Sequence, residues 1–382
     1  MQQSLKMTRR RALTGLGAAA AASLTGCAAV PAAVRLDRYS RPLSRRPFVA
    51  PRISMDRIVR VVVGLRPYRR SGFVVRRERL DDKEIVHNYG HGGGGLSLSW
   101  GSSALAVREA QSLPAGDAAV LGSGVMGLTT ARLLQDAGWR VTIYTRDTLR
   151  HSTSSVGAGQ WAPTSVFEEA FATPAFEAQF QAAARIAHHA YQNLVGADYG
   201  VRFIENYYLN RRSTEPPYYL RVMPELFTSV ADLDTDQHPF PAPYVRRAVS
   251  LFIEPARFLR RIRDDFLLAG GRMVIRNFEN LAAVLGLEEG VIFNCTGLGS
   301  KALFADDELT PIKGQLVFIP PDPAVDYLTV GGGSGNTYMF PRVGEIVLGG
   351  SYQKGDWSRN PEPEVTERIV GDNRRLFDNL RI

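Results

Sequence analysis

Four consecutive glycines at positions 92–95, between His91 and Leu96, suggest a place where the backbone itself binds a ligand. Glycine tolerates positive φ and allows close approach to main-chain amides. The residues that follow have the spacing of one apolar helix face, formed by Leu96, Trp100, Ala104 and Val107. A glycine turn that opens a helix offers free N–H groups and the positive end of the helix dipole to developing negative charge. Taken alone, the same run is also typical of a flexible surface loop.

A second glycine-rich loop, Gly122-Ser123-Gly124-Val125-Met126-Gly127, has the context of a dinucleotide-binding site. An apolar strand is expected before it at 118–121, a helix after it at 128–137, and a second strand at 139–144. The glycines then provide a tight turn, close approach of a pyrophosphate, and close packing of the helix on the strand. The fingerprint does not choose between NAD and FAD. The acidic residue that would hold the ribose is Asp147 or is missing.

The composition is that of an ordinary globular protein. The chain has 382 residues, of which 45% are hydrophobic and 22% charged, and this length allows two domains. Its net charge of +8 comes from the first part of the chain, because residues 1–60 hold twelve Lys or Arg and two Asp. The remainder carries 34 basic and 36 acidic side chains, so nucleic-acid binding is not indicated. The six histidines form no metal-spaced cluster, and we expect no metal site.

Residues 1–34 have the pattern of an export signal. Thr8-Arg9-Arg10-Arg11 precedes an apolar, alanine-rich run at 12–24 that is too short for a stable membrane span. The twin arginine favours the Tat route, and Leu24-Thr25-Gly26-Cys27 resembles a bacterial lipobox in which Cys27 is acylated. These patterns predict a periplasmic or cell-surface protein with a lipid anchor in the membrane, followed by an Arg/Pro-rich linker at 35–52. An uncleaved tail is the alternative.

The rest of the chain predicts a mixture of helices and strands, with a loop-rich stretch at 216–243. Strands are expected at 58–64, 72–79, 85–86, 207–210, 273–275, 291–297, 315–319, 338–340 and 345–349, and helices at 96–112, 171–194, 254–269 and 364–380.

Several sequence blocks cover nearly everything from residue 53 onwards. They are Arg66-Pro67 within 64–69, His91-Gly92-Gly93 within 87–93, the loop at 153–163, the strand at 291–297 with Lys313-Gly314-Gln315, and Tyr338-Met339-Phe340-Pro341. Together they resemble the D-amino-acid oxidase family of FAD enzymes. In that family the blocks at 64–69 and 87–93 close the chain, whereas here they precede the loop at 122–127. The order therefore resembles a circular permutation, with a short turn at 113–117 as the new connection.

The resemblance implies an α/β fold with two interleaved parts. One part is a Rossmann-like FAD-binding domain of the glutathione-reductase type, and it is expected at 84–168 and 249–303. The other is an α+β substrate domain built on a mixed or antiparallel sheet, and it is expected at 53–83, 169–248 and 304–382.

The resemblance also implies a reaction and the residues that perform it. Arg66 grips the substrate carboxylate through two parallel bonds, and the phenol of Tyr338 donates a third. A D-amino acid then loses its Cα hydrogen as hydride to flavin N5, and the imino acid hydrolyses to a 2-oxo acid and ammonia. The glycine-turn amides stabilise negative charge on the reduced ring. The expected FAD-binding residues are Gly92, Gly93, Gly95, Leu96, Ser97, Gly122, Gly124, Val125, Met126, Gly127, Thr153, Ser154, Ser155, Gly159, Gln160, Trp161, Thr296 and Gly297.

Two departures from the family pattern concern the substrate pocket, which is expected to include Gly93, Gly94 and Ser334. Gly94 stands where an aromatic roof residue is expected, and Ser334 stands in place of a lid tyrosine, so a wider pocket is predicted. Two alternatives therefore stay open. One is a related flavin amine oxidoreductase that acts on glycine or an N-methyl amino acid, with oxygen or a quinone as electron acceptor. The other is a flavoprotein that binds an amino acid without turnover.

Overall fold

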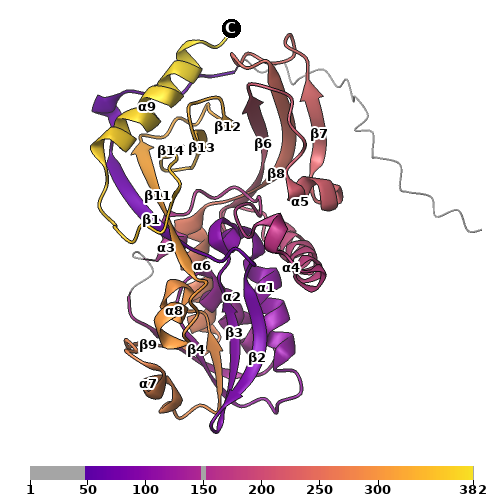
Figure 1. The fold of residues 1–382 in the computed structure, drawn as a ribbon, viewed down its shortest axis with the longest axis vertical. Coiled ribbons are helices and arrows are strands. Elements are labelled where there is room, and N and C mark those ends of the chain that lie inside the picture. The colour runs from indigo at the N-terminus through magenta and orange to yellow at the C-terminus, as the bar shows by residue number, and fades with distance from the viewer. Residues whose placement is uncertain (1–47, 148–151, 382) are drawn as a thin grey trace, which may run out of the picture. The chain divides into compact units, whose positions relative to one another are not determined.

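A computed structural model describes residues 48–147 and 152–381. Within this part of the chain the strands form two sheets, one of six strands and one of nine (Figure 1). We call the first the parallel sheet and the second the mixed sheet, after the direction of their strands.

The parallel sheet contains the βαβ unit that the sequence predicts. Its strands are, in spatial order, β2 (Val74–Leu80), β3 (Lys83–Tyr89), β10 (Val291–Asn294), β4 (Asp117–Leu121), β5 (Arg140–Thr145) and β9 (Arg272–Ile275). All neighbours are parallel except the edge strand β2, which pairs antiparallel with β3. Because parallel strands end at the same edge, the loops that follow β3, β4, β5 and β10 gather at one side of the sheet.

Helices cover both faces of the parallel sheet. The α-helices of the described chain are α1 (Gly95–Glu109), α2 (Val125–Asp136), α3 (Thr153–Val156), α4 (Pro174–Gln192), α5 (Tyr218–Val222), α6 (Pro255–Leu268), α7 (Leu281–Leu285), α8 (Ser300–Leu303) and α9 (Pro363–Asp378), and not all of them lie on this sheet. Helix α1 contacts α2 and α4, and α2 contacts α6, so these four helices form the layer on one face. Residues of α7 and α8 join the apolar cluster on the opposite face. The predicted apolar stripe of α6 is confirmed, since Phe258, Leu259, Ile262 and Phe266 are buried.

Helix α1 buries a different face from the one that its apolar spacing predicts. The predicted apolar stripe is only half-buried, and it consists of Leu96, Trp100, Ala104 and Val107. The buried face instead contains four serines, Ser97, Ser99, Ser102 and Ser103. The helix is enclosed by the parallel sheet, α2 and α4, so small hydroxyl side chains suit its closest contacts. Gly101 shows how close these are, because a Cβ there would lie 1.7 Å from the carbonyl oxygen of Ala183 in α4.

The mixed sheet is mainly antiparallel. Its strands follow the order β1 (Arg60–Tyr68), β11 (Thr310–Ile319), β14 (Ile346–Gly349), β13 (Tyr338–Pro341), β12 (Tyr327–Gly331), β6 (Val201–Asn210), β8 (Tyr244–Ile253) and β7 (Thr228–Leu233), with β15 (Gln353–Lys354) also paired to β11. Strands β12 and β6 are parallel to each other. One face packs against α9, and the other carries the side chains of Leu316, Tyr338 and Phe340.

The two ends of the described chain meet on the mixed sheet. The ring of Phe48 packs edge-on against Tyr207, Phe240 and Tyr327, with centroids 5.1–5.4 Å apart. Near the other end, Arg381 donates from its backbone to Pro239 and from its side chain to the Phe240 carbonyl. Residues 48–52 are therefore anchored by packing, which corrects the prediction that the linker extends through residue 52.

Two other predicted boundaries differ from the strand pairing. Strand β2 pairs with β3 and lies in the parallel sheet, although the predicted boundaries place 53–83 in the other domain. Strand β8 continues to Ile253 in the mixed sheet, beyond the predicted break at 248. Its middle residues, Arg246 and Arg247, interrupt the apolar pattern, so the sequence does not reveal this strand. The division into domains otherwise stays a prediction.

No helix in the described part of the chain has the length and apolarity needed to cross a membrane. The predicted export signal at 1–34, with Cys27, and the linker up to residue 47 lie outside the described residues.

Candidate functional site

A cavity of about 1330 Å³ lies between the carboxyl ends of the parallel strands and the face of the mixed sheet that carries Tyr338. Its wall includes residues that end or follow four parallel strands, among them Tyr89, Leu121, Thr145 and Cys295. Small-molecule sites commonly enclose roughly 300–1,000 Å³. The cavity is therefore large enough for a dinucleotide and a second, small ligand.

The loop between β4 and α2 has the geometry of a pyrophosphate cradle. Gly122 has a φ of +98°, and a Cβ there would lie 2.7 Å from the carbonyl oxygen of Cys295. A Cβ on Gly127 would lie 1.9 Å from the carbonyl oxygen of Gly122, so α2 packs against its own loop without room for a side chain. Gly124 faces open space, with the hydroxyl oxygen of Ser154 as its nearest atom at 3.5 Å. The loop is thus closed on two sides and open toward the cavity.

The four-glycine run forms a single 3-10 turn and then opens α1. Gly92 has a φ of +54°, the N–H of Gly93 donates to the Ser165 carbonyl at 3.0 Å, and the N–H of Gly94 donates to the His91 carbonyl at 2.9 Å. The first N–H groups of an α-helix have no partner within the helix. Because Gly95 and Leu96 begin α1 and line the cavity, those donors lie at its wall. This arrangement suits negative charge on a bound ring.

His91 supports this turn rather than entering the chemistry. Its ring stacks on Phe73 with centroids 4.5 Å apart, and its Nε2 lies 2.6 Å from the hydroxyl of Ser102. Ser102 donates its hydrogen to the Asn88 side-chain oxygen, so Nε2–H of His91 is the donor to Ser102. Full burial lowers the pKa of His91 to about 3. The imidazole is therefore neutral and fixed in one tautomer.

Replacing His91 with Gln is expected to make unfolding less sensitive to acid. The ordinary His pKa of 6.5 applies to the unfolded chain, so that state takes up a proton below pH 6.5 while native His91 does not. The stability that neutral His91 contributes is complete above pH 6.5 and is lost as pH falls toward 3. The free energy of unfolding can be measured with urea at several pH values between about pH 7 and about pH 4. Its dependence on pH should show that the variant takes up about one proton fewer on unfolding than the original protein.

His189→Gln is the matched control, because His189 lies exposed on helix α4. Equal dependence of the unfolding free energy on pH in the two variants would contradict the role assigned to buried His91.

Arg66 and Tyr338 meet in the cavity from separate strands of the mixed sheet. Arg66 lies on β1 and Tyr338 on β13, and both line the cavity. The Nη1 atom of Arg66 is buried and has no hydrogen-bond partner among the described residues. Burial raises the pKa of the Tyr338 phenol, and the charge of Arg66 opposes this only in part. The phenol stays protonated and can donate a hydrogen bond beside the guanidinium.

Glycines make room for these two side chains. A Cβ on Gly314 of β11 would lie 2.5 Å from a guanidinium nitrogen of Arg66. A Cβ on Gly349 would lie 2.0 Å from the ring of Tyr338, and Gly350 is nearly as close. The glycines of Lys313-Gly314-Gln315 and of 349–350 therefore serve the site by lacking side chains.

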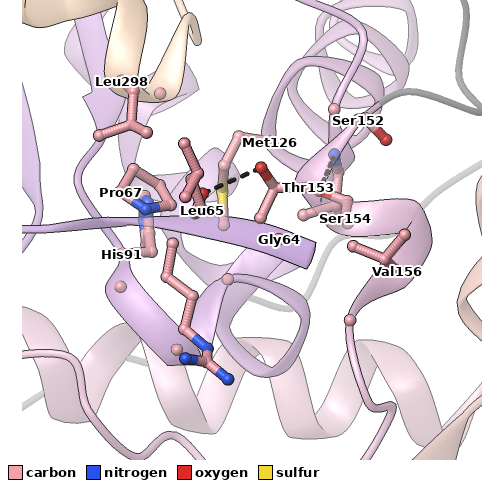
Figure 2. Close-up of a pocket in the computed structure, with 18 of the residues that line it drawn as sticks. Gly64, Leu65, Pro67, His91, Met126, Ser152, Thr153, Ser154, Val156 and Leu298 are labelled. Atoms are coloured by element: carbon pink, nitrogen blue, oxygen red, sulfur yellow. Dashed lines mark hydrogen bonds between the residues drawn. The ribbon is translucent and has the colours of Figure 1, made fainter. Parts of the chain in front are cut away.

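Strand β1 also contacts the short helix α3, which follows the loop after β5. Figure 2 shows Thr153 and Val156 beside Gly64 and Leu65. The hydroxyl of Thr153 donates to the Leu65 carbonyl at 3.0 Å, and the hydroxyl of Ser154 accepts from the N–H of Val125 at 3.1 Å. Helix α3 thus joins the strand that carries Arg66 to the start of α2.

Most of the site residues predicted from the sequence line this one cavity. They are Arg66, Gly92, Gly93, Gly95, Leu96, Gly122, Gly124, Val125, Met126, Thr153, Ser154, Gly159, Gln160, Thr296, Gly297 and Tyr338. Four of the predicted residues are not part of the lining, namely Ser97, Gly127, Ser155 and Trp161. Trp161, for example, is fully buried against His188 and Phe227.

Gly94 and Ser334, which are predicted to belong to the substrate pocket, are not among the residues that line this cavity. A Cβ on Gly94 would lie 2.5 Å from Val166, so this glycine serves packing. The N–H and hydroxyl of Ser334 donate to Asp372 of α9 at 3.1 and 2.7 Å. Asp372 is buried, and bonds from Ser334 and Arg375 hold its carboxyl pKa below the usual value although burial alone would raise it. The neighbouring residues 335–337 line the cavity in place of Ser334.

Sequence reasoning missed other residues of the wall. Residues 276–279 follow β9 and line the end of the cavity near β5, where the Arg276 guanidinium lies 4.9 Å from the centre of the Phe278 ring. Tyr352 lines the end near Arg66, and Arg359 is also part of the wall. These segments have no periodic pattern and no motif, and only their position after a parallel strand, or beside β11, identifies them.

Asp147 does line the cavity, and its carboxylate pairs with Arg146 at 3.0 Å.

Comparison with known families identifies this arrangement. The family model described as FAD dependent oxidoreductase (DAO) matches residues 117–382. The chain belongs to this family. A D-amino-acid oxidase of Streptomyces coelicolor is 30% identical over 260 residues, which cover 67% of this chain and 76% of that protein. A D-aspartate oxidase of Homo sapiens is 28% identical over 260 residues, which cover 66% and 73%.

A solved structure has a similar fold. Glycine oxidase from Geobacillus kaustophilus superposes with a TM-score of 0.52 at 15% identity, over 69% of this chain and 78% of that one. The predicted fold class, a Rossmann-like FAD domain with a second, mixed sheet, is confirmed.

The residues present fit FAD, the cofactor of the family. The open face of Gly124, the exposed start of α2 and the cavity volume suit a dinucleotide, and the glycine turn at 92–95 supplies donors for a ring. Among the described residues, no group of three His, Cys, Asp or Glu side chains could hold a metal ion. The protein is an FAD-dependent oxidoreductase related to D-amino-acid oxidases.

Proposed function

We propose that this oxidoreductase deaminates a D-amino acid by oxidation at Cα. The observation that carries the proposal is Arg66, which lies beside the Tyr338 phenol in the cavity with a buried Nη1 atom that has no partner among the described residues. A planar guanidinium binds a carboxylate through two parallel, charge-assisted bonds. Arg66 with a protonated phenol next to it is therefore a receptor for the carboxylate of an amino acid.

Once the carboxylate is bound, oxidation at Cα depends more on the position of the substrate than on acid or base catalysis by the protein. When bound, FAD accepts two electrons and the hydrogen that leave Cα. Arg66 and Tyr338 hold the carboxylate so that Cα is oriented toward the cofactor, and such orientation supplies much of the rate enhancement. The donors at the start of α1 stabilise the negative charge that develops. The imino acid product then hydrolyses in water to a 2-oxo acid and ammonia.

The proposal is tested by measuring 2-oxo acid and ammonia formation from a panel of D- and L-amino acids, glycine and sarcosine. We expect product from D-amino acids and none from their L-enantiomers, with oxygen or an artificial quinone as acceptor. Faster turnover of glycine or sarcosine than of any D-amino acid would contradict the proposal and would indicate an oxidoreductase of glycine or N-methyl amino acids. Absence of product from every compound would favour a binding protein.

We also propose that the protein is exported by the Tat route and anchored through acylated Cys27. The support is the sequence alone, namely the twin arginine at 9–10 and the lipobox pattern ending at Cys27. Mass spectrometry of the protein from membranes should find a mature N-terminus at Cys27 with attached acyl chains. A mature protein that retains residues 1–26 would contradict this.

We further infer that the chain is a circular permutation of the family order. Three observations support this inference. The family match begins at residue 117, yet β1, β3 and α1 before it complete both sheets and carry Arg66 and the glycine turn. Phe48 and Arg381 both contact Phe240, so the two ends of the described chain lie close together. Residues 110–116 form a short connection from α1 to β4, in which Gln111, Ser112, Pro114 and Ala115 are exposed.

A chain restored to the family order should fold and bind FAD. Such a variant begins at Asp117, joins Arg381 to Phe48 through a short Gly/Ser linker, and ends at residue 116. Because the new break falls in an exposed connection and the linker spans neighbouring ends, we expect an FAD content equal to that of the original order and a similar melting temperature. Failure of the restored chain to bind FAD with linkers of several lengths would contradict the inference.

A further inference from the structure

Charged side chains are distributed unevenly along the cavity. Near the ends of β5 and β9 the wall carries two positive and two negative side chains, Arg146, Arg276, Asp147 and Glu279. The other charged side chains in the wall are Arg66 and Arg359, and no further acidic side chain among the described residues lines the cavity. The α-carboxylate of a substrate neutralises Arg66 alone. A second positive charge is left at Arg359.

The segment that contains Arg359 is held by ion pairs with Lys313, a buried lysine on the strand next to that of Arg66. Lys313 of β11 faces Leu65 in the register with β1, and its side chain is 2% exposed. Its ammonium pairs with Asp356 at 2.9 Å and also with Glu362. This pair holds the loop that carries Trp357 and Arg359 against the strand next to that of Arg66.

Hydrogen bonds within the loop restrict it further. The Asp356 carboxylate accepts from the N–H of Ser358 at 2.7 Å, and the Ser358 hydroxyl accepts from the N–H of Asn360 at 3.1 Å. Arg359 lies between these two anchored residues. Arg359 is exposed at the edge of the cavity, and its guanidinium makes no hydrogen bond or ion pair with another described residue.

The carboxylates around the loop are already paired with other cations, so they do not neutralise Arg359. Asp356 and Glu362 bind Lys313, and Glu168 binds Lys354 at 2.9 Å. Asp372 of α9 pairs with Arg375 and lies 3.7 Å from Arg368. Arg368 itself lines a small hollow beside the cavity.

We propose that the substrate is a D-amino acid with an acidic side chain, D-aspartate or D-glutamate, and that Arg359 binds the side-chain carboxylate. This inference rests on the proposed function and names its substrate class. Arg66 takes the α-carboxylate, and the second carboxylate points toward Arg359. The positive charges of Arg66 and Arg359 repel a substrate with a basic side chain. A substrate with an amide side chain of equal size binds less tightly than the acid, because its hydrogen bond to the guanidinium has only one charged partner.

The test compares each acid with its isosteric amide in the holoenzyme, D-glutamate with D-glutamine and D-aspartate with D-asparagine. We expect kcat/KM to be about tenfold higher for the acids, since a hydrogen bond between charged groups is worth roughly one such factor. Arg359→Gln should bring the ratio of kcat/KM for acid to kcat/KM for amide close to one. We expect kcat/KM to fall for the acids and to stay unchanged for the amides. Arg374→Gln is the matched control, because Arg374 lies exposed on α9 and pairs with Asp378. Equal kcat/KM for acids and amides in the original protein would overturn the inference.

A binding measurement separates this inference from the proposed function. Succinate and its monoamide succinamate have no amine to oxidise, so calorimetry reports the two carboxylate sites without turnover. Tighter binding of succinate, lost in Arg359→Gln and kept in Arg374→Gln, supports the acidic subsite even if no D-amino acid is oxidised. Equal binding of the two compounds would overturn the subsite, while turnover of neutral D-amino acids would leave the proposed function intact.

Discussion

Arg66→Met is expected to lower kcat/KM for a D-amino acid by roughly 30- to 4,000-fold, because truncating one side of a buried charge pair costs about 2–5 kcal/mol. The methionine fills similar space but leaves the substrate carboxylate without its two charge-assisted bonds. Arg66→Lys should recover only part of the loss, since an ammonium keeps the charge but lacks the planar fork. The measurement is steady-state kinetics on protein with a verified flavin content.

Two comparisons make this prediction specific. Arg76→Met changes an arginine on β2 that is 62% exposed, and it should leave kcat/KM unchanged. The FAD content of Arg66→Met should equal that of the original protein, since the Arg66 guanidinium lies beside Gly314 and Tyr338 at the substrate end of the cavity. Unchanged kcat/KM in Arg66→Met would remove Arg66 from the substrate site.

Gly127→Ala is expected to abolish tight FAD binding. The added Cβ would lie 1.9 Å from the Gly122 carbonyl oxygen and 2.8 Å from its carbon. Both contacts are with backbone, so relief requires the loop at 122–124 or the start of α2 to move, and overpacking of this kind costs roughly 1–3 kcal/mol. The same movement displaces the amides that bind the pyrophosphate. We expect purified Gly127→Ala to lack flavin absorbance and its melting temperature not to rise when FAD is added.

Gly344→Ala provides the control for this substitution. A Cβ on Gly344 would meet no heavy atom within 4 Å other than those of its chain neighbours, and the φ of Gly344 is not in the left-handed region. This variant should keep its flavin and its melting temperature. Full FAD occupancy in Gly127→Ala would show that the loop tolerates the contact and would contradict the cradle described above.

Local sequence patterns are sufficient to predict the dinucleotide loop. The strand at 118–121, the glycines at 122, 124 and 127, and the helix that follows are all neighbours in sequence, and the structure places them as expected. The meeting of Arg66 and Tyr338 is different. It depends on the pairing of β1 with β11 and of β14 with β13, and only the family resemblance indicates it.

Packing between distant elements explains where prediction fails. The apolar spacing of α1 indicates one buried stripe, but enclosure by α2 and α4 buries the serines instead. Strand β8 escapes prediction because Arg247 in its middle is buried beside Glu205, at 3.7 Å, which no local pattern reveals. The glycine-rich loop around Ser334 leads to the prediction that Ser334 lines the pocket. Only the fold shows that the Ser334 hydroxyl donates a hydrogen bond to Asp372 of α9.

The most direct test of the central claim is an anaerobic absorbance spectrum of the purified protein before and after addition of a D-amino acid and, separately, of its L-enantiomer. Oxidation at Cα with FAD as acceptor predicts flavin bands that bleach with the D-enantiomer and persist with the L-enantiomer. Flavin bands that persist with D-aspartate, D-glutamate and neutral D-amino acids alike would contradict the proposed reaction.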